Sequence, residues 1–289
     1  MNEQIIMLGT GSAMVTKCYN TCFLIKSSDE CFLVDAGGGN GILTQIEKVN
    51  ISWNGIRNMF VTHSHTDHII GVVWVIRKIS SLMLENKYTG NFNIYCHDKS
   101  AETINMLCKL TLAPKFLNCV NTRIFINVVS DGEMLLTENF KFTFFDIHSD
   151  KTKQFGFNLT FNSGKTLVCL GDEPYNNKSR KYVYKKDYMM CEAFCLHGQK
   201  NIFKPYEKFH STALDAGKLA QSLEIKNLVL FHTEDKTLDT RKINYTSETK
   251  TVFSGNVYVP DDLEDPVIQT ISYSSLYLSK ASLNCIYVA

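Results

Sequence analysis

The densest cluster of metal-binding residue types in the chain is the run Val61-Thr62-His63-Ser64-His65-Thr66-Asp67-His68. Imidazole nitrogens and a carboxylate within six residues are suitable ligands for zinc, manganese or iron. His63 and His65 lie two positions apart, so in an extended segment both side chains point to one side. Three protonated histidines this close would repel one another, and a bound cation removes that repulsion. The alternative, a histidine-rich surface loop, is disfavoured because the run lies between an expected strand and an expected helix.

Three further polar residues follow apolar runs later in the chain. They are His148, Asp172 and His232, and each is expected at the end of a strand. Polar side chains at strand ends can meet at one rim of a sheet, which is where metal ligands are commonly placed. For each residue taken alone, a buried or capping role is the alternative.

The hydrophobic pattern alternates between strand-like and helix-like segments. The polar turn at residues 27–30 predicts a hairpin between the second and third strands. Expected strands cover 4–8, 21–26, 31–35, 57–62, 91–96, 123–129, 140–147, 156–161, 166–170, 188–193, 227–231 and 252–259. Expected helices cover 42–49, 67–79, 99–110 and 212–223.

The middle of this pattern is expected to be an antiparallel meander, which excludes a purely parallel doubly wound sheet. It favours the α+β class, as an αββα sandwich in which two mixed β-sheets pack face to face with helices outside. We expect residues 1–289 to form a single domain. The apolar, serine-rich tail after Ile268 receives no assignment.

Composition sets limits on partners and compartment. The 30 basic and 29 acidic residues give a formal net charge of +1, so no global attraction to nucleic acid or anionic membrane is expected. The chain shows no signal-peptide pattern and no apolar stretch that could span a membrane. We therefore expect a cytoplasmic protein, with its ten cysteines as buried free thiols.

The histidine run resembles the signature of the metallo-β-lactamase superfamily. The segment Phe32-Leu33-Val34-Asp35-Ala36-Gly37 is similar to that family's first motif, and the resemblance gives Asp35 the role of orienting the histidine loop. The resemblance implies two divalent metals, with zinc favoured and manganese or iron as alternatives. The first metal would take His63, His65 and His148, the second would take Asp67, His68 and His232, and Asp172 would bridge them.

Two further segments resemble the RNase Z branch of this superfamily. Cys191-Glu192-Ala193-Phe194 and His210-Ser211-Thr212 are similar to its paired HEAT and HST motifs, although cysteine replaces the first histidine. The resemblance implies that His210 donates a proton to the leaving oxygen and that Glu192 orients it. The alternative for His210 is a loop residue before a helix that Ser211 or Thr212 caps.

The resemblance implies a metal-dependent hydrolase in which two metals lower the pKa of a shared water. The hydroxide would attack an electrophilic centre, with Asp67 aiming it. We expect a phosphodiester substrate, either a small nucleotide such as a cyclic nucleotide or an RNA end. Hydrolysis of an ester, thioester or lactone on the same metal core is the second interpretation, and a non-catalytic metal-binding protein is the third.

The resemblance departs from RNase Z in the segment that grips tRNA. Only about two dozen residues separate His148 from Asp172, enough for a hairpin and too few for the branch's long arm. Together with the balanced charge, this predicts an endonuclease-like centre without a large tRNA footprint. Because members of the branch often dimerise, the resemblance also allows a homodimer.

Overall fold

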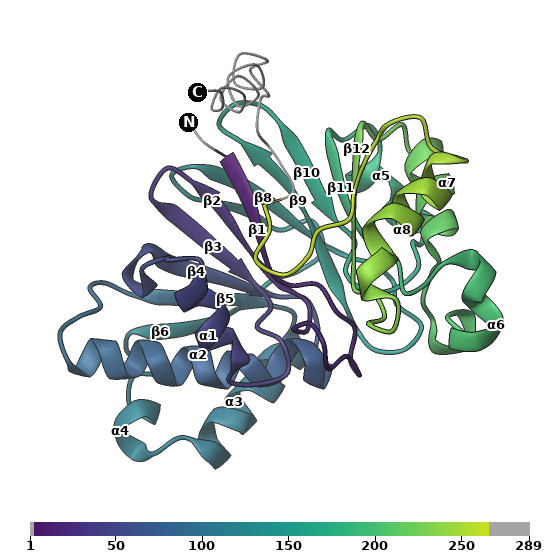
Figure 1. Ribbon diagram of the computed structural model, residues 1–289. Helices are drawn as coiled ribbons and strands as arrows, with labels where there is room; N and C mark the ends of the chain where they lie inside the picture. The colour runs from purple at the N-terminus through teal and green to yellow at the C-terminus, as the bar shows by residue number, and fades with distance from the viewer. Residues whose placement is uncertain (1–2, 266–289) are drawn as a thin grey trace, which may run out of the picture.

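In the computed structural model, which describes residues 3–265, two β-sheets pack face to face with helices on their outer sides (Figure 1). In the first sheet the strands lie in chain order, antiparallel from β1 to β3 and parallel from β3 to β6. These strands are β1 (Glu3–Gly9), β2 (Cys22–Ser27), β3 (Glu30–Val34), β4 (Ile56–Val61), β5 (Phe92–Cys96) and β6 (Ile124–Val128).

The second sheet also keeps chain order in space, antiparallel from β7 to β10 and parallel from β10 to β13. Its strands are β7 (Met134–Leu136), β8 (Phe140–Asp146), β9 (Phe155–Phe161), β10 (Thr166–Cys169), β11 (Tyr188–Glu192), β12 (Asn227–Phe231) and β13 (Asn256–Tyr258). Each sheet therefore contains a run of parallel strands whose carboxyl ends lie along one edge. Such an edge suits metal ligands that directly follow strands.

Helices cover the two outer faces separately (Figure 1). On the first sheet lie α1 (Gly41–Lys48), α2 (Thr66–Leu84), α3 (Asp98–Thr111) and the short α4 (Pro114–Leu117). The second sheet is flanked by α5 (Arg180–Val183), α6 (Lys200–Phe203), α7 (Ala213–Ser222) and α8 (Arg241–Lys250). The predicted αββα sandwich is confirmed.

Alternating aromatic residues join the two sheets. Phe140, Phe142 and Phe144 recur with the two-residue period of β8, so all three face the same side and enter the core between the sheets. The Phe142 ring lies 4.3 Å from that of Phe32 on β3, and the Phe144 ring lies 4.8 Å from that of Phe60 on β4. This shared core supports the expectation of a single domain, which remains a prediction.

The structure differs from the expected elements at several points, among them the end of α2 at Leu84 instead of residue 79. The segment 123–129 is not part of the antiparallel meander, because β6 pairs in parallel with β5 in the first sheet. The segment 252–259 contains only the short β13. Helix α8 was not expected, because its sequence RKINYTSETK is polar with several β-branched residues and buries only three side chains. The tail after Ile268 lies outside the described residues.

The expectation of free thiols is confirmed for the nine cysteines in the described part of the chain, eight of which are buried. Among the described residues, no helix combines the length and apolar character needed to cross a membrane.

A glycine on α2 sets the distance between this helix and the end of β3. A Cβ atom on Gly71 would lie 1.9 Å from the carbonyl oxygen of Ala36, closer than any real contact. The absence of a side chain allows the Gly71 amide to donate to the Gly37 carbonyl at 2.9 Å and the Ala36 amide to donate to the His68 carbonyl at 3.1 Å. The first turn of α2 is thereby held against the segment that carries Asp35.

We predict that Gly71→Ala destabilises the fold although alanine is the better helix former. Alanine gains about 1 kcal/mol of helix propensity, but forcing a methyl group into the backbone costs about 1–3 kcal/mol or more and moves the helix start. Chemical denaturation checks the free energy of unfolding, with Gly198→Ala as the control because open space surrounds Gly198. Equal stability of the two variants would contradict the close approach.

Candidate metal centre

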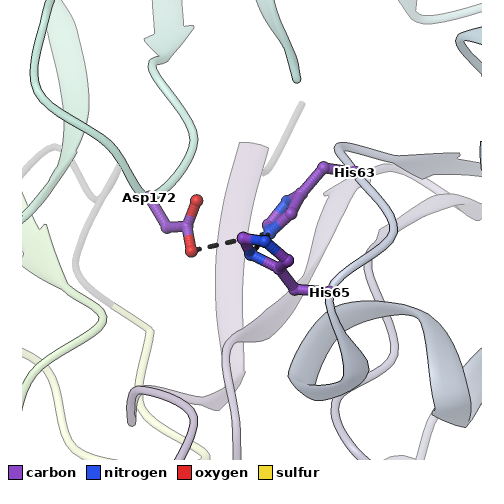
Figure 2. Close-up of side chains that lie close together, drawn as sticks. All are labelled: His63, His65 and Asp172. Carbon is purple, nitrogen blue, oxygen red and sulfur yellow. Dashed lines mark hydrogen bonds and ion pairs between the residues drawn. The ribbon is translucent and has the colours of Figure 1, made fainter. Parts of the chain in front are cut away.

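Six of the seven predicted ligands gather in two groups, each with one ligand atom per residue and all atoms within 4.8 Å of one another. The groups are His63 with His65 and Asp172, and Asp67 with His68 and His232. Figure 2 shows the two imidazoles of the first group facing the Asp172 carboxylate, which comes from a separate loop. All but His65 are buried.

Strand ends and one helix start position these side chains. His63 and His65 follow β4, and Asp67 and His68 lie in the first turn of α2, where a carboxylate is favoured by the helix dipole. Asp172 follows β10 and His232 follows β12. Because β10 and β12 run parallel in one sheet, their carboxyl ends meet at the same rim, opposite the end of β4 in the other sheet.

One carboxylate oxygen contacts histidines of both groups. Oδ2 of Asp172 lies 3.6 Å from Nε2 of His63, 3.5 Å from Nε2 of His68 and 3.4 Å from Nε2 of His232. Oδ2 of Asp67 lies 3.4 Å from the same His68 nitrogen. A single oxygen placed between two ligand groups has the geometry of a bridging ligand.

The Asp35 carboxylate fixes two of the histidines through their other ring nitrogen. It accepts hydrogen bonds from Nδ1 of His68 at 2.8 Å, and from the amide and hydroxyl of Thr62 at 2.8 and 2.7 Å. Since the Thr62 hydroxyl donates to Asp35, its oxygen accepts the Nδ1 proton of His63 at 2.9 Å. In both rings Nε2 is the nitrogen that faces the centre and would bind a metal.

The same arrangement recurs at His232. The hydroxyl of Thr21 donates to the Gly11 carbonyl at 3.1 Å, so its oxygen accepts from Nδ1 of His232 at 2.9 Å. His65 differs from these rings, because its Nδ1 and not its Nε2 faces the centre, 2.8 Å from Nε2 of His63. At this separation a neutral His65 that carries its proton on Nδ1 donates it to Nε2 of His63, and a cation bound by both nitrogens would take the place of that proton.

Burial and neighbouring charges act differently on two of these histidines. Burial, only partly offset by Asp172, holds the pKa of His63 well below its usual value, so the charged imidazolium form of His63 is disfavoured. Burial also opposes charge on His68, but the Asp67 and Asp35 carboxylates outweigh it and raise the pKa of His68. Nε2 of His68 is nevertheless buried without a hydrogen-bond partner. This donor set fits divalent metal ions better than it fits an apolar or purely hydrogen-bonded core.

His148 lies in neither group. It follows β8, its imidazole is half-buried, and its backbone is left-handed with φ of 59°. Left-handed backbone is uncommon for a non-glycine residue and is typical of functional sites. Its role as a ligand of the first metal remains a prediction.

Gln154 belongs to the centre although no motif in the sequence indicated it. Its amide nitrogen donates to Oδ1 of Asp172 and lies 2.9 Å from Nδ1 of His63. It is fully buried and comes directly before β9, within a polar loop that resembles no motif. The hydrogen bond leaves the other Asp172 oxygen, Oδ2, for the histidines.

The structure does not pair His210 with Glu192 in the way that the sequence led us to expect. Nδ1 of His210 donates to the backbone carbonyl of Asp172 at 2.9 Å, whereas the nearest Glu192 oxygen is 3.7 Å away. Glu192 instead accepts from the backbone amide of Ser211. It therefore positions the loop and not the imidazole directly.

Burial is the main cause of the shifted pKa values of Glu192 and His210. It raises the pKa of Glu192 well above its usual range and, with the neighbouring His232, lowers the pKa of His210 to about 3. The imidazole is neutral in the substrate-free protein. An anionic group beside it would raise that pKa, which is the condition under which His210 can act as an acid.

The sequence model of the family described as anti-Pycsar protein Apyc1 matches residues 3–258. A ribonuclease Z from Nitrosopumilus maritimus is 23% identical, over 90% of this chain and 98% of its own length.

Two solved structures are also similar. The metallo-β-lactamase fold protein YhfI from Bacillus subtilis has a TM-score of 0.74 at 20% identity, covering 92% of this chain and 99% of that one. A diphosphatase from the PhnP family has a TM-score of 0.70 at 16% identity, covering 92% and 98%. These matches confirm the predicted metallo-β-lactamase fold and its RNase Z-like branch.

We predict that Asp172→Ala lowers metal content and reduces activity by more than about 100-fold, because replacing even an outer partner of a metal ligand costs about 10–100-fold. Elemental analysis and circular dichroism would show lost metal in a folded protein.

His148→Ala should lose only part of the metal. His197→Ala is the control, since His197 contacts Lys200 and Tyr206 instead. Full activity and full metal content in Asp172→Ala would refute the bridging assignment.

Metal binding near neutral pH should release protons. The pKa of His68 is raised, so its imidazole is protonated at its ordinary pKa of 6.5 and for some distance above it, and a metal must displace that proton. Calorimetric titration of metal into the apo protein, repeated in buffers of different ionisation enthalpy, measures the release. Asp35→Asn should reduce it, because one of the two carboxylates that raise the pKa becomes neutral. Release that is absent from wild type would contradict the assignment of His68.

Proposed function

The chain belongs to the anti-Pycsar protein Apyc1 family, and we propose that its metal centre hydrolyses a phosphodiester bond in a small nucleotide. The observation that carries this proposal is the position of Asp172 Oδ2 between histidines of two ligand groups. Two adjacent cations would supply a nucleophilic water and would stabilise the charge on the phosphoryl oxygens. As the family description suggests, we propose that the chain counteracts Pycsar.

Four residues of this chain then take separate roles in the proposed hydrolysis. Asp67, whose carboxylate is kept ionised by the neighbouring His68 despite burial, accepts a hydrogen bond from the attacking water and aims it. His210 donates a proton to the leaving oxygen. Glu192 fixes the His210 loop through Ser211, and Gln154 holds the second oxygen of Asp172.

The segment between β8 and the Asp172 loop limits the size of the substrate. Residues 149–171 contain only the antiparallel pair β9 and β10, so this segment provides no extended arm to hold a tRNA. The formal net charge of +1 also gives little attraction for a long polyanion. A small cyclic nucleotide fits these limits best, and an RNA end is the alternative within the same chemistry.

For the metal we propose zinc, with manganese and iron as alternatives that accept the same His/Asp donors. The nine cysteines between residues 3 and 265 are free thiols, which supports action in a reducing compartment that we propose to be the cytoplasm. A homodimer remains a prediction.

The substrate class is tested by apo protein reconstituted separately with Zn²⁺, Mn²⁺ and Fe²⁺. We expect turnover of bis-p-nitrophenyl phosphate and of 3′,5′-cyclic nucleotides, and little turnover of p-nitrophenyl acetate, because the centre stabilises an anionic phosphoryl group. Asp67→Asn serves as the control for uncatalysed or contaminating activity and should lose most of the turnover. Hydrolysis of the acetate ester without any phosphodiester hydrolysis would overturn the proposal in favour of an esterase.

A further inference from the structure

An exposed aromatic ring stands beside His210. Phe209 is 45% exposed, and its backbone is left-handed, with φ of 58° and ψ of 46°. For a bulky side chain this conformation is an outlier that costs folding free energy. The surrounding turn maintains it, since the Phe209 amide donates to Tyr206 at 3.2 Å and the His210 amide donates to Pro205 at 2.9 Å. A strained backbone that exposes an apolar ring is unfavourable for stability and is typical of ligand-binding positions.

The neighbours of Phe209 place it at the metal centre. The adjacent His210 is bonded to the Asp172 carbonyl, and its ring lies 5.4 Å from that of His232. Another aromatic residue, Phe194, is buried and stacks on His210 at 4.9 Å with an interplanar angle of 6°. His210 is therefore supported by a buried aromatic ring from the segment after β11 and is preceded by an aromatic ring that is open to solvent.

A lysine from a second loop reaches the same place. The ammonium of Lys151, three residues after His148, lies 5.8 Å from the centre of the Phe209 ring. Lys151 therefore faces the exposed ring of the residue that directly precedes His210. Within the described residues it forms no ion pair with a carboxylate, so its charge is available to a substrate.

We propose that Phe209 and Lys151 form a nucleotide clamp, in which the ring stacks on the base and the ammonium pairs with the phosphate oxygens. The clamp rests on the proposed function and specifies its substrate as a nucleoside phosphodiester. A charged phosphate is a stronger partner for the ammonium than an exposed aromatic face, so substrate binding draws Lys151 from the ring and frees that face for the base. Stacking on a single ring accepts every base, whereas hydrogen bonds to base edges would discriminate among them.

Two substrates with one leaving group test the clamp. Thymidine 5′-(p-nitrophenyl phosphate) and methyl p-nitrophenyl phosphate differ only in the nucleoside. Phe209→Asn removes the ring while keeping a residue that tolerates left-handed backbone, so its thermal stability should equal or exceed that of wild type. We expect the ratio of kcat/KM for the nucleoside ester to that for the methyl ester to fall about 10-fold, mainly through KM.

Three further variants complete the comparison. Phe209→Tyr should restore the ratio, and Lys151→Met should lower kcat/KM for both substrates, because both carry the same anionic phosphodiester. The exposed Ile202 on α6 provides a matched apolar control, since Ile202→Asn should leave the ratio unchanged. An unchanged ratio in Phe209→Asn, with wild type active on both substrates, would overturn the clamp and leave the phosphodiesterase proposal standing.

A binding measurement separates the clamp from turnover. Metal-loaded wild type should bind thymidine 5′-monophosphate in a calorimetric titration, and Phe209→Asn should bind it about 10-fold more weakly. If wild type hydrolyses neither ester at full metal occupancy, the proposed function fails, and this binding difference still decides whether the clamp is correct. Equal affinities of wild type and Phe209→Asn would overturn it.

Discussion

The centre of this protein depends on one electrostatic constraint: buried histidines and aspartates converge with their metal-binding atoms facing one another. Nε2 of His63 and Nδ1 of His65 lie 2.8 Å apart, and burial disfavours the charged form of His63. Oδ2 of Asp172 lies within 3.6 Å of three imidazoles. Buried carboxylates are unfavourable without compensating positive charge, and Nε2 of His68 is buried among them without a hydrogen-bond partner. Divalent cations provide that charge, and the chemistry that we propose follows from their position.

The backbone contributes to this convergence through strained residues at strand ends. Asp35 after β3, His148 after β8 and His232 after β12 all have left-handed backbone, with φ of 54°, 59° and 56°. Gly171, directly before Asp172, has φ of 76° and packs so closely on Gln154 that a Cβ atom would clash with it. Left-handed backbone at a strand end turns the chain sharply, and its cost is tolerated where the surrounding contacts fix it.

A buried arginine shows how distant segments support these positions. Arg241 on α8 donates to the hydroxyl of Thr233, the residue after His232, at 2.8 Å. It also donates to the Pro260 carbonyl at 2.8 Å and the Asp261 carboxylate at 2.7 Å. The segment after β13 and the loop of His232 are thereby joined through one side chain. The unexpected helix α8 thus has a structural role at the metal centre.

The sequence predicted the features that depend on local pattern. The run from His63 to His68, the strand ends at Asp172 and His232 and the hairpin of β2 and β3 are all visible as spacing and periodicity. It could not predict the parallel pairing of β6, because apolar periodicity does not encode which neighbour a strand selects.

Contacts between segments that lie far apart in the chain could not be predicted from the sequence either. Gln154 is an isolated polar residue until the fold brings it to Asp172. The pairing of His210 with a backbone carbonyl instead of Glu192 depends on loop geometry, which spacing along the chain does not determine.

Anomalous diffraction from crystals of the metal-loaded protein, recorded at the absorption edge of the metal, tests this account most directly. The account predicts two separate peaks. One should lie within bonding distance of His63 and His65, the other within bonding distance of His68 and His232, with Asp172 Oδ2 contacting both. A metal-loaded crystal with its only peaks away from these side chains, or with Asp172 contacting neither metal, would contradict it.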